Sequence, residues 1–323
     1  MGKVIGIGEA LIDFIPMEKG VPLQEVNRFE RMAGGAPANV CACVARLGHK
    51  SIVLTKLGED AFGDFIENTL VKVGVDTSLV KRTKEANTAL AFVSLKSDGN
   101  RDFSFYRNPS ADMLLSEDEI DESIFEQGDI LHFCSVDLVD APVRKAHDKA
   151  IHITRKKNGL ISFDVNVRLP LWEDHHAYRR VINQYLDHAD IVKISDEELE
   201  FVTGKTFEQG AIKELLRGNV KLLVYTEGPK GATVYTHQNK YAHKGFKVDA
   251  IDTTGSGDAF IGAFLVTLVE SKTKIDFNDA NQFKDHIVFA NAVGAIVASR
   301  RGAITSMPSK DEVTSFLKQN HIE

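Results

Sequence analysis

The stretch DTTGSGD, residues 252–258, places two glycines between two acidic residues, directly before an apolar run. Glycine is unfavourable at a helix start unless the backbone must turn sharply or approach another group. The residues that follow, DAFIGAFLVTLV, are apolar at nearly every position and predict a buried helix. Free N–H groups at Gly255, Ser256 and Gly257 would then bind an anion. The alternative is a side-chain cap from Asp252 or Ser256, with Asp258 complementing the helix dipole.

A second polar pattern lies in SFDVNVR, residues 162–168. Asp164, Asn166 and Arg168 alternate with apolar residues, so one face of a strand would carry all three. A solvated edge strand would also alternate. However, Pro170 ends the run, and loops that follow parallel strands form ligand crevices. We therefore predict that Arg168 contacts a phosphate group and neutralises charge during its transfer, while the other two polar residues could simply hold the arginine.

Short β-rich runs alternate with helical patterns along the chain, which implies βαβ units and a mainly parallel sheet. The expected strands are residues 3–8, 51–58, 129–133, 160–167, 190–195 and 221–228, and the clearest helices are 38–48, 62–75 and 143–159. Residues 10–32 and 86–107 interrupt this alternation and are typical of β-hairpins, the second turning at Asp98-Gly99. We expect them to form a small lid over a cleft, which could also serve as a subunit contact.

Composition excludes several classes of protein. The 323 residues include 39 basic and 46 acidic ones, a net charge of −7, whereas nucleic-acid binding usually leaves a basic patch. No stretch approaches the length of a transmembrane helix, and the N-terminus lacks the apolar region of a signal peptide, so we expect a cytoplasmic enzyme. The three cysteines are expected to be buried thiols. Because no flexible linker divides the chain, residues 1–323 are predicted to form one domain.

The sequence DTTGSGD closely resembles the C-terminal signature of the PfkB (ribokinase-like) carbohydrate kinases, and AGGAPANVCACVARLG (33–48) resembles their N-terminal signature. The resemblance runs from about residue 3 to about residue 308. It implies a three-layer α/β sandwich with a mainly parallel central sheet and a small β-sheet lid. It also implies that Asp258 accepts the proton of a sugar hydroxyl while residues 255–257 hold the transferred phosphoryl group, which agrees with the positioning and charge stabilisation that phosphoryl transfer needs.

The same resemblance assigns further residues to each ligand. Those expected at the sugar are Asp13, Gly34, Gly35 and Asn39, with Phe105 and Arg107 on the lid near the substrate mouth. Those expected at ATP are Lys193, Ser195, Thr226, Gly228, Gly231, Gly257 and Asn291.

Two metal ions are implied as well. Glu198 matches an acid linked to Mg²⁺, through water, although Ser195 stands where many relatives have Asn; an acidic helix start is the alternative interpretation. The positions that match a K⁺ site, held largely through main-chain carbonyls, are Asp252, Thr254, Val297, Arg300, Gly302 and Ser306.

Residues 101–115 and 164–172 resemble the fructokinases of this family in particular, which implies phosphorylation of a primary hydroxyl of fructose by ATP to give fructose 6-phosphate. A 2-keto-3-deoxygluconate kinase is an alternative, because Arg107 and Arg168 could receive a carboxylate. Aminoimidazole riboside kinase is another, and a non-catalytic sugar or nucleotide sensor is an alternative of a different class. A dinucleotide-binding turn is excluded because Leu11 stands in place of its third glycine, and no P-loop motif occurs. The lid makes a homodimer plausible.

Overall fold

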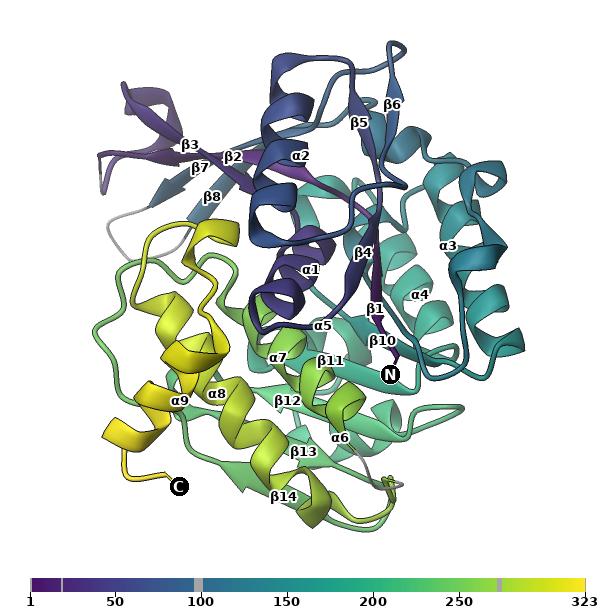
Figure 1. Ribbon diagram of the computed structural model, residues 1–323, viewed down its shortest axis with the longest axis vertical. Coiled ribbons are helices and arrows are strands. Elements are labelled where there is room, and N and C mark those ends of the chain that lie inside the picture. Colours follow the sequence, from purple (N-terminus) through teal and green to yellow (C-terminus); the bar gives the residue numbers. More distant parts are fainter. Residues whose placement is uncertain (1, 19, 96–100, 272–274, 323) are drawn as a thin grey trace.

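A computed structural model (Figure 1) describes residues 2–18, 20–95, 101–271 and 275–322. Within these residues a sheet of eight strands runs through the centre of the protein. Its strands, in spatial order, are β14 (Lys240–His243), β13 (Ala232–Tyr235), β12 (Leu222–Thr226), β11 (Ile191–Ser195), β10 (Leu160–Asp164), β9 (Ile130–Cys134), β1 (Val4–Ile7) and β4 (Ser51–Leu54). Neighbouring strands from β12 to β4 are parallel, whereas β13 and β14 are antiparallel. The predicted mainly parallel sheet is confirmed.

Helices cover both faces of this sheet. On one face pack α1 (Ala36–Arg46), α2 (Ala61–Val73), α7 (Ser256–Glu270), α8 (Lys284–Ala298) and α9 (Lys310–Gln319). On the other face pack α3 (Pro142–Lys156), α4 (His175–Leu186), α5 (Asp196–Thr203) and α6 (Glu208–Leu215). Because successive strand side chains point to opposite faces, Val4 joins the first hydrophobic cluster and Ile5 the second. The three-layer prediction is confirmed.

Short 3₁₀ helices fill many of the connections. They are η1 (Leu23–Glu25), η2 (Ala111–Leu114), η3 (Glu117–Glu119), η4 (Glu122–Ile124), η5 (Ser135–Asp137), η6 (Leu169–Leu171), η7 (Gly228–Lys230), η8 (Ala280–Phe283) and η9 (Ile304–Ser306). In the part of the chain that the structure describes, no helix is both long and apolar enough to span a membrane.

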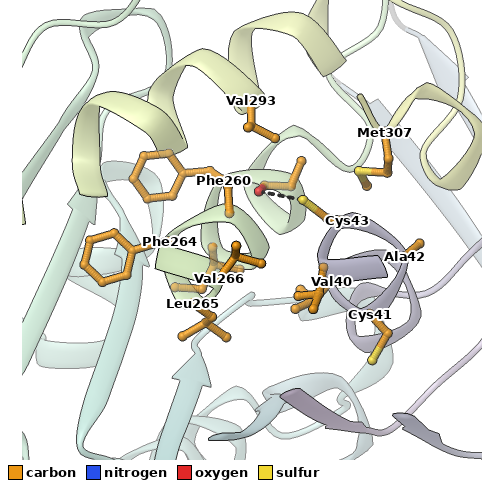
Figure 2. Close-up of a cluster of buried hydrophobic side chains, with 14 of the residues drawn as sticks. Val40, Cys41, Ala42, Cys43, Phe260, Phe264, Leu265, Val266, Val293 and Met307 are labelled. Atoms are coloured by element: carbon orange, nitrogen blue, oxygen red, sulfur yellow. Dashed lines mark hydrogen bonds between the residues drawn. The ribbon is translucent and has the colours of Figure 1, made fainter. Parts of the chain in front are cut away.

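The apolar run after residue 257 forms α7, which is buried along most of its length as predicted. Figure 2 shows it packed against α1. A Cβ atom on Gly262 would lie 2.9 Å from the Cβ of Cys43, so glycine permits this close approach, and Cys43 Sγ donates to the carbonyl oxygen of Ala259 at 3.3 Å. All three cysteines are free and buried, as predicted. The start of α7 is thus fixed relative to α1.

The lid is a separate four-stranded sheet, β3 (Phe29–Gly34), β2 (Leu11–Pro16), β7 (Leu90–Leu95) and β8 (Arg101–Tyr106), in that order. Strands β2 and β3 pair antiparallel, as do β7 and β8, which confirms both hairpins; β2 and β7 join them in parallel. The predicted turn at Asp98-Gly99 lies outside the described residues.

Two predicted strands are shorter in the structure. Residues 51–58 form β4 and then β5 (Lys56–Gly58), which pairs with β6 (Lys81–Thr83) instead of the central sheet. The reason is that β1 ends beside Leu54, where Gly8 turns the chain away with a φ of +138°. Residues 160–167 form a strand only to Asp164, because Asn166 adopts a φ of +43° that no strand can continue.

Candidate active site

The N-terminus of α7 carries no side-chain cap. The helix begins at Ser256 after Gly255, whose φ of +74° is a left-handed conformation that favours glycine. Both alternative caps have other partners. Asp252 Oδ1 accepts from the N–H and the hydroxyl of Thr254 (3.0 and 2.7 Å), and Ser256 Oγ donates to Gly294 O at 3.0 Å. No side chain therefore caps the first turn of α7, as an anion site requires, although the N–H of Ser256 donates to the carbonyl oxygen of Thr253 at 3.2 Å.

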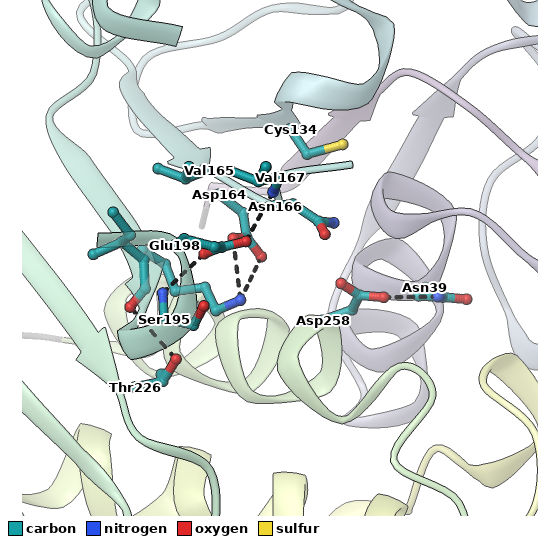
Figure 3. Close-up of polar contacts among 12 residues, drawn as sticks. Asn39, Cys134, Asp164, Val165, Asn166, Val167, Ser195, Glu198, Thr226 and Asp258 are labelled. Atoms are coloured by element: carbon teal, nitrogen blue, oxygen red, sulfur yellow. Dashed lines mark hydrogen bonds and ion pairs between the residues drawn. The ribbon is translucent and has the colours of Figure 1, made fainter. Parts of the chain in front are cut away.

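Asp258 lies in the first turn of α7 and meets Asn39 of α1. Asn39 Nδ2 donates to Asp258 Oδ2 at 2.8 Å, across 219 residues of sequence (Figure 3). Burial raises the pKa of Asp258, whereas the hydrogen bond from Asn39 and the charges of Lys193 and Arg168 lower it. Asn39 Oδ1 is buried without a hydrogen-bond partner in the structure. A carboxylate and an unused acceptor thus lie side by side, an arrangement suited to sugar hydroxyls.

The glycine pair before α1 is required by close packing. A Cβ atom on Gly34 would lie 2.2 Å from Asp13 Oδ2, so its absence leaves space for this carboxylate of the lid. Gly35 has a φ of +104°, and a Cβ there would lie 2.4 Å from the carbonyl oxygen of Glu9. The structure therefore brings Asp13, the glycine pair and the first turns of α1 together beneath the lid.

Phe105 and Arg107 lie at the end of β8, but in different surroundings. Phe105 packs against Leu11 and two alanines of the lid. The Arg107 side chain is only 3% exposed and forms ion pairs with Asp112 and Asp137. The charge of Glu9 also raises the pKa of Arg107. Carboxylates of the protein itself therefore surround the Arg107 guanidinium group, and its place near the substrate mouth stays a prediction.

The loop after β10 carries Arg168. In one alternative Asp164 would hold this arginine. Instead, Asp164 pairs with Lys193 (Nζ to Oδ1 3.1 Å and to Oδ2 2.9 Å). Arg168 Nη1 donates to the carbonyl oxygen of Val167 at 2.9 Å, and its charge lowers the pKa of Asp258. The bend at Asn166 explains the difference, because beyond Asp164 side chains no longer alternate as on a strand. Arg168 is thus within electrostatic range of Asp258.

Glu198 acts within the protein as a capping residue. Its Oε2 accepts from the N–H of Ser195 at 2.9 Å in the capping box of α5, and its Oε1 accepts from the N–H of Val167 at 2.8 Å (Figure 3). The described residues contain no group of three or more His, Cys, Asp or Glu side chains that could hold a metal ion. The link between Glu198 and Mg²⁺ stays a prediction.

A cavity of about 630 Å³ opens on the side of the α7 N-terminus away from the contact between Asp258 and Asn39. This volume is within the range of small-molecule sites. Every residue predicted to bind ATP lines it, namely Lys193, Ser195, Thr226, Gly228, Gly231, Gly257 and Asn291. A Cβ atom on Gly257 would lie 3.1 Å from Lys193 Nζ, so a positive charge stands beside the main-chain N–H groups at the start of α7. The cavity and these donors form one continuous site.

Sequence reasoning missed part of this cavity. Phe246, Lys247, Val248 and Ala250 also line it, from the connection between β14 and α7. That connection has no regular secondary structure, although Phe246, Val248 and Ala250 alternate with polar residues as in a strand. This alternation of apolar and polar residues was the one available signal.

The residues predicted to hold K⁺ lie together where the chain approaches α7. Asp252 Oδ2 accepts from the N–H of Gly302 at 3.2 Å, although these residues are 50 positions apart. Arg300 bridges the others, because its N–H donates to Val297 O at 3.0 Å and its Nη1 donates to Ser306 O at 3.3 Å. Each carbonyl oxygen has a second lone pair, so these hydrogen bonds do not preclude a cation. The ion itself stays a prediction.

Comparison with known proteins agrees with this geometry. A family model described as pfkB family carbohydrate kinase matches residues 1–310. The chain is 43% identical over 318 residues to probable fructokinase-2 of Arabidopsis thaliana, covering 98% of this chain and 96% of that protein.

Two solved structures are similar over almost their whole length. One is a fructokinase with bound ATP from Xylella fastidiosa, with a TM-score of 0.89 and 34% identity, covering 99% of both chains. The other is a fructokinase from Vibrio cholerae O395 with fructose, ADP and a calcium ion bound, with a TM-score of 0.88 and 34% identity, covering 98% of this chain and 99% of that one.

Proposed function

Because the chain belongs to the pfkB family of carbohydrate kinases, we propose that it transfers the terminal phosphoryl group of ATP to a primary hydroxyl of fructose. The products are ADP and fructose 6-phosphate. The observation that carries this proposal is the position of the uncapped α7 N-terminus. The 630 Å³ cavity lies on one side of it, and the contact between Asp258 and Asn39 lies on the other.

The residues divide the reaction between them. The sugar oxygen forms a bond to the terminal phosphorus of ATP, the bond to the bridging oxygen breaks, and the sugar proton passes to the Asp258 carboxylate. N–H groups at Gly255, Ser256 and Gly257 bind the phosphoryl oxygens during transfer, and Lys193 and Arg168 neutralise the negative charge that moves to ADP. Asp258 needs no strong basicity, because phosphoryl transfer depends mainly on position and charge.

On the sugar side, the Asp13 carboxylate and Asn39 Oδ1 accept hydrogen bonds from the hydroxyl groups, while Gly34 leaves space for that carboxylate and Gly35 permits the turn before α1. Phe105 contributes an apolar wall from the lid, packed on Leu11. On the nucleotide side, the base and ribose of ATP occupy the cavity that Thr226, Gly228, Gly231 and Asn291 line.

A divalent metal ion bound to the ATP phosphates supplies further charge neutralisation, and we propose Mg²⁺ in that place. Glu198 and Ser195 would bind its water molecules, and each Glu198 oxygen that accepts one N–H keeps a second lone pair for this. We also propose that K⁺ binds at the oxygen-rich group around Asp252, Thr254, Val297, Arg300, Gly302 and Ser306. There it would strengthen the anion site at the start of α7.

The choice of fructose over a sugar acid rests on Arg107, since Arg168 is assigned here to the charge that moves during phosphoryl transfer. A 2-keto-3-deoxygluconate kinase needs a free cation for the substrate carboxylate. Arg107 already pairs with Asp112 and Asp137, so its charge is balanced within the protein. Fructose carries no charge and requires no such partner. Aminoimidazole riboside is uncharged as well, and the experiment below must include it.

A substrate panel tests the proposal directly. Initial rates with ATP are measured for fructose, ribose, 2-keto-3-deoxygluconate and aminoimidazole riboside, and the products are identified by mass spectrometry. We expect fructose to have the highest kcat/KM. A higher value for another member would move the assignment to that sugar. Binding of fructose and ATP without any turnover would instead favour a sensor on the same fold.

Three further features are proposed with this function. One face of the lid gathers Phe14, Phe29 and Phe92 in aromatic contact, and Tyr106 beside them is 63% exposed. This face would bind the same face of a second copy in a homodimer, which sedimentation would detect. One domain formed by residues 1–323 and a cytoplasmic location also stay predictions.

A further inference from the structure

In the loop that carries Arg168, residues 165–168, each main-chain N–H group outside the bend at Asn166 donates a hydrogen bond. The N–H of Val165 donates to Lys193 O at 3.0 Å, that of Val167 donates to Glu198 Oε1 at 2.8 Å, and that of Arg168 donates to Tyr178 Oη at 3.0 Å. Residues beyond a strand end are usually more mobile than the sheet, so contacts of this kind decide how accurately the arginine is placed. The third contact comes from a residue with no assigned role.

The hydroxyl of Tyr178 belongs to a chain of hydrogen bonds with one consistent direction. Ser135 Oγ lies 2.6 Å from Tyr178 Oη, and it also contacts the carbonyl oxygens of Val165 and Asn166. Carbonyl oxygens can only accept, so Ser135 donates to them and must accept from Tyr178. Tyr178 in turn accepts from the N–H of Arg168. Tyr178 thus ties the end of the loop to its beginning.

Tyr178 is itself held rigidly. It comes from α4, is 0% exposed, and stacks on Trp172 with ring centroids 4.7 Å apart and planes 8° apart. Its ring also contacts Phe201 of α5. A fixed aromatic ring places its hydroxyl at one point, so the bond to Arg168 requires little further ordering of the tyrosine.

We propose that Tyr178 is a positioning residue that fixes Arg168 for phosphoryl transfer by holding its main-chain N–H. This inference rests on the proposed function only in giving Arg168 a role at the transferred group. Tyr178 touches no reacting atom; it acts through the main chain of residues 165–168. Because a displacement of about 1 Å in a catalytic group can cost up to about a hundredfold in rate, loss of one anchor should be measurable.

The test removes one hydroxyl and compares it with a matched control. Tyr178→Phe removes the acceptor of the Arg168 N–H. Tyr185→Phe removes a hydroxyl from the same helix, where a 5% exposed tyrosine donates to Asp148 Oδ1 at 2.6 Å. Hydrogen–deuterium exchange at residues 165–168 should be faster in Tyr178→Phe and unchanged in Tyr185→Phe. Unchanged exchange in Tyr178→Phe would overturn the proposal, whatever the enzyme phosphorylates.

Kinetics of a double-mutant cycle with Arg168→Ala separate positioning from a general structural effect. We expect Tyr178→Phe to lower kcat about tenfold with the KM for ATP and sugar changed less than about twofold, as for a contact that matters in the transition state. In the Arg168→Ala background the same change should cost less than about twofold. An equal loss in both backgrounds, or the same loss in Tyr185→Phe, would refute the proposal.

The cycle uses whichever sugar of the panel the wild type phosphorylates best, so an error in the choice of fructose does not affect it. If no sugar were phosphorylated, the proposed function would fail, while the exchange measurement would still decide whether Tyr178 holds the loop.

Discussion

Replacement of Asn39 by leucine tests the link between geometry and proton transfer. Asn39 is 4% exposed, and its Nδ2 donates to Asp258 Oδ2 at 2.8 Å. Leucine has a similar size but no donor. Burial raises the pKa of Asp258 and the hydrogen bond from Asn39 opposes this rise, so Asn39→Leu should raise the pKa of Asp258 further. Only the ionised carboxylate accepts a proton, so activity exists above this pKa and is lost as the pH falls through it.

The acidic limb of the kcat/KM profile should therefore move to higher pH in Asn39→Leu. A hydrogen bond to a charged group contributes about 1.5–3 kcal/mol, and about 1.4 kcal/mol corresponds to a tenfold factor. The value of kcat/KM is first expressed relative to the plateau of the same enzyme. At a pH on the acidic limb, this relative value should be about ten- to hundredfold lower for the variant than for wild type. The plateau of kcat/KM at higher pH is compared separately between Asn39→Leu and wild type, because a lower plateau in the variant reports loss of the sugar contact of Asn39.

The assay is the pH dependence of kcat/KM for wild type, Asn39→Leu and a control, Asn183→Leu. The Asn183 side chain lies on α4, where its Nδ2 donates to the main-chain carbonyls of Arg179 and Val202 at 2.9 and 3.0 Å. Asn183→Leu should leave the acidic limb of the kcat/KM profile at the same pH as in wild type. If the plateau fell in Asn39→Leu while the limb did not move, Asp258 would not be the group that limits activity at low pH.

Four further predictions follow from the site and its support. Asp258→Asn should lower kcat by about 10²–10⁴-fold and leave ATP binding unchanged by calorimetry, since it removes the proton acceptor and keeps the shape. Gly255→Ala should lower the free energy of unfolding in urea. The left-handed φ of +74° should cost about 1–2 kcal/mol, and the contact of the new Cβ, 2.9 Å from Ala303 Cβ, should cost about 1–3 kcal/mol more. Burial raises the pKa of Glu9 to about 7, so its neutral form stabilises the fold at low pH, and this stability is lost as the pH rises through 7. Glu9→Gln should therefore gain thermal stability relative to wild type between pH 5 and 8. Replacement of K⁺ by Na⁺ should lower kcat.

Each of these predictions has a control variant or a result that would contradict it. Gly48→Ala shares a left-handed φ of +89° but has no atom within 4 Å of its Cβ, so the difference between the two glycine variants isolates the contact with Ala303. Near-normal turnover in Asp258→Asn would remove this carboxylate from the mechanism. Parallel stability curves for Glu9→Gln and wild type would contradict a proton held at Glu9. An unchanged rate in Na⁺ would count against the potassium site.

The sequence by itself determined the features that depend on local chain geometry. The apolar run after Gly257 could only be a buried helix, and a glycine before it permitted the left-handed turn seen at Gly255. The alternation of strands and helices likewise predicted the parallel sheet, and its two interruptions predicted the lid hairpins, whereas the nucleotide side of the cleft was implied only by the resemblance to a known family. These features follow from residue type and spacing within a few positions, where backbone sterics and side-chain periodicity leave few alternatives.

Only the tertiary structure decided which side chains meet. The contact of Asn39 with Asp258 spans 219 residues, and Lys193 rather than Arg168 is the partner of Asp164. Arg107 was predicted on the lid near the substrate mouth, and only the fold shows that Asp112 and Asp137 surround its guanidinium group. Ion pairs and hydrogen bonds between distant segments depend on how helices and loops pack around the sheet. A charged residue has the same sequence pattern whether it faces a ligand or a buried partner.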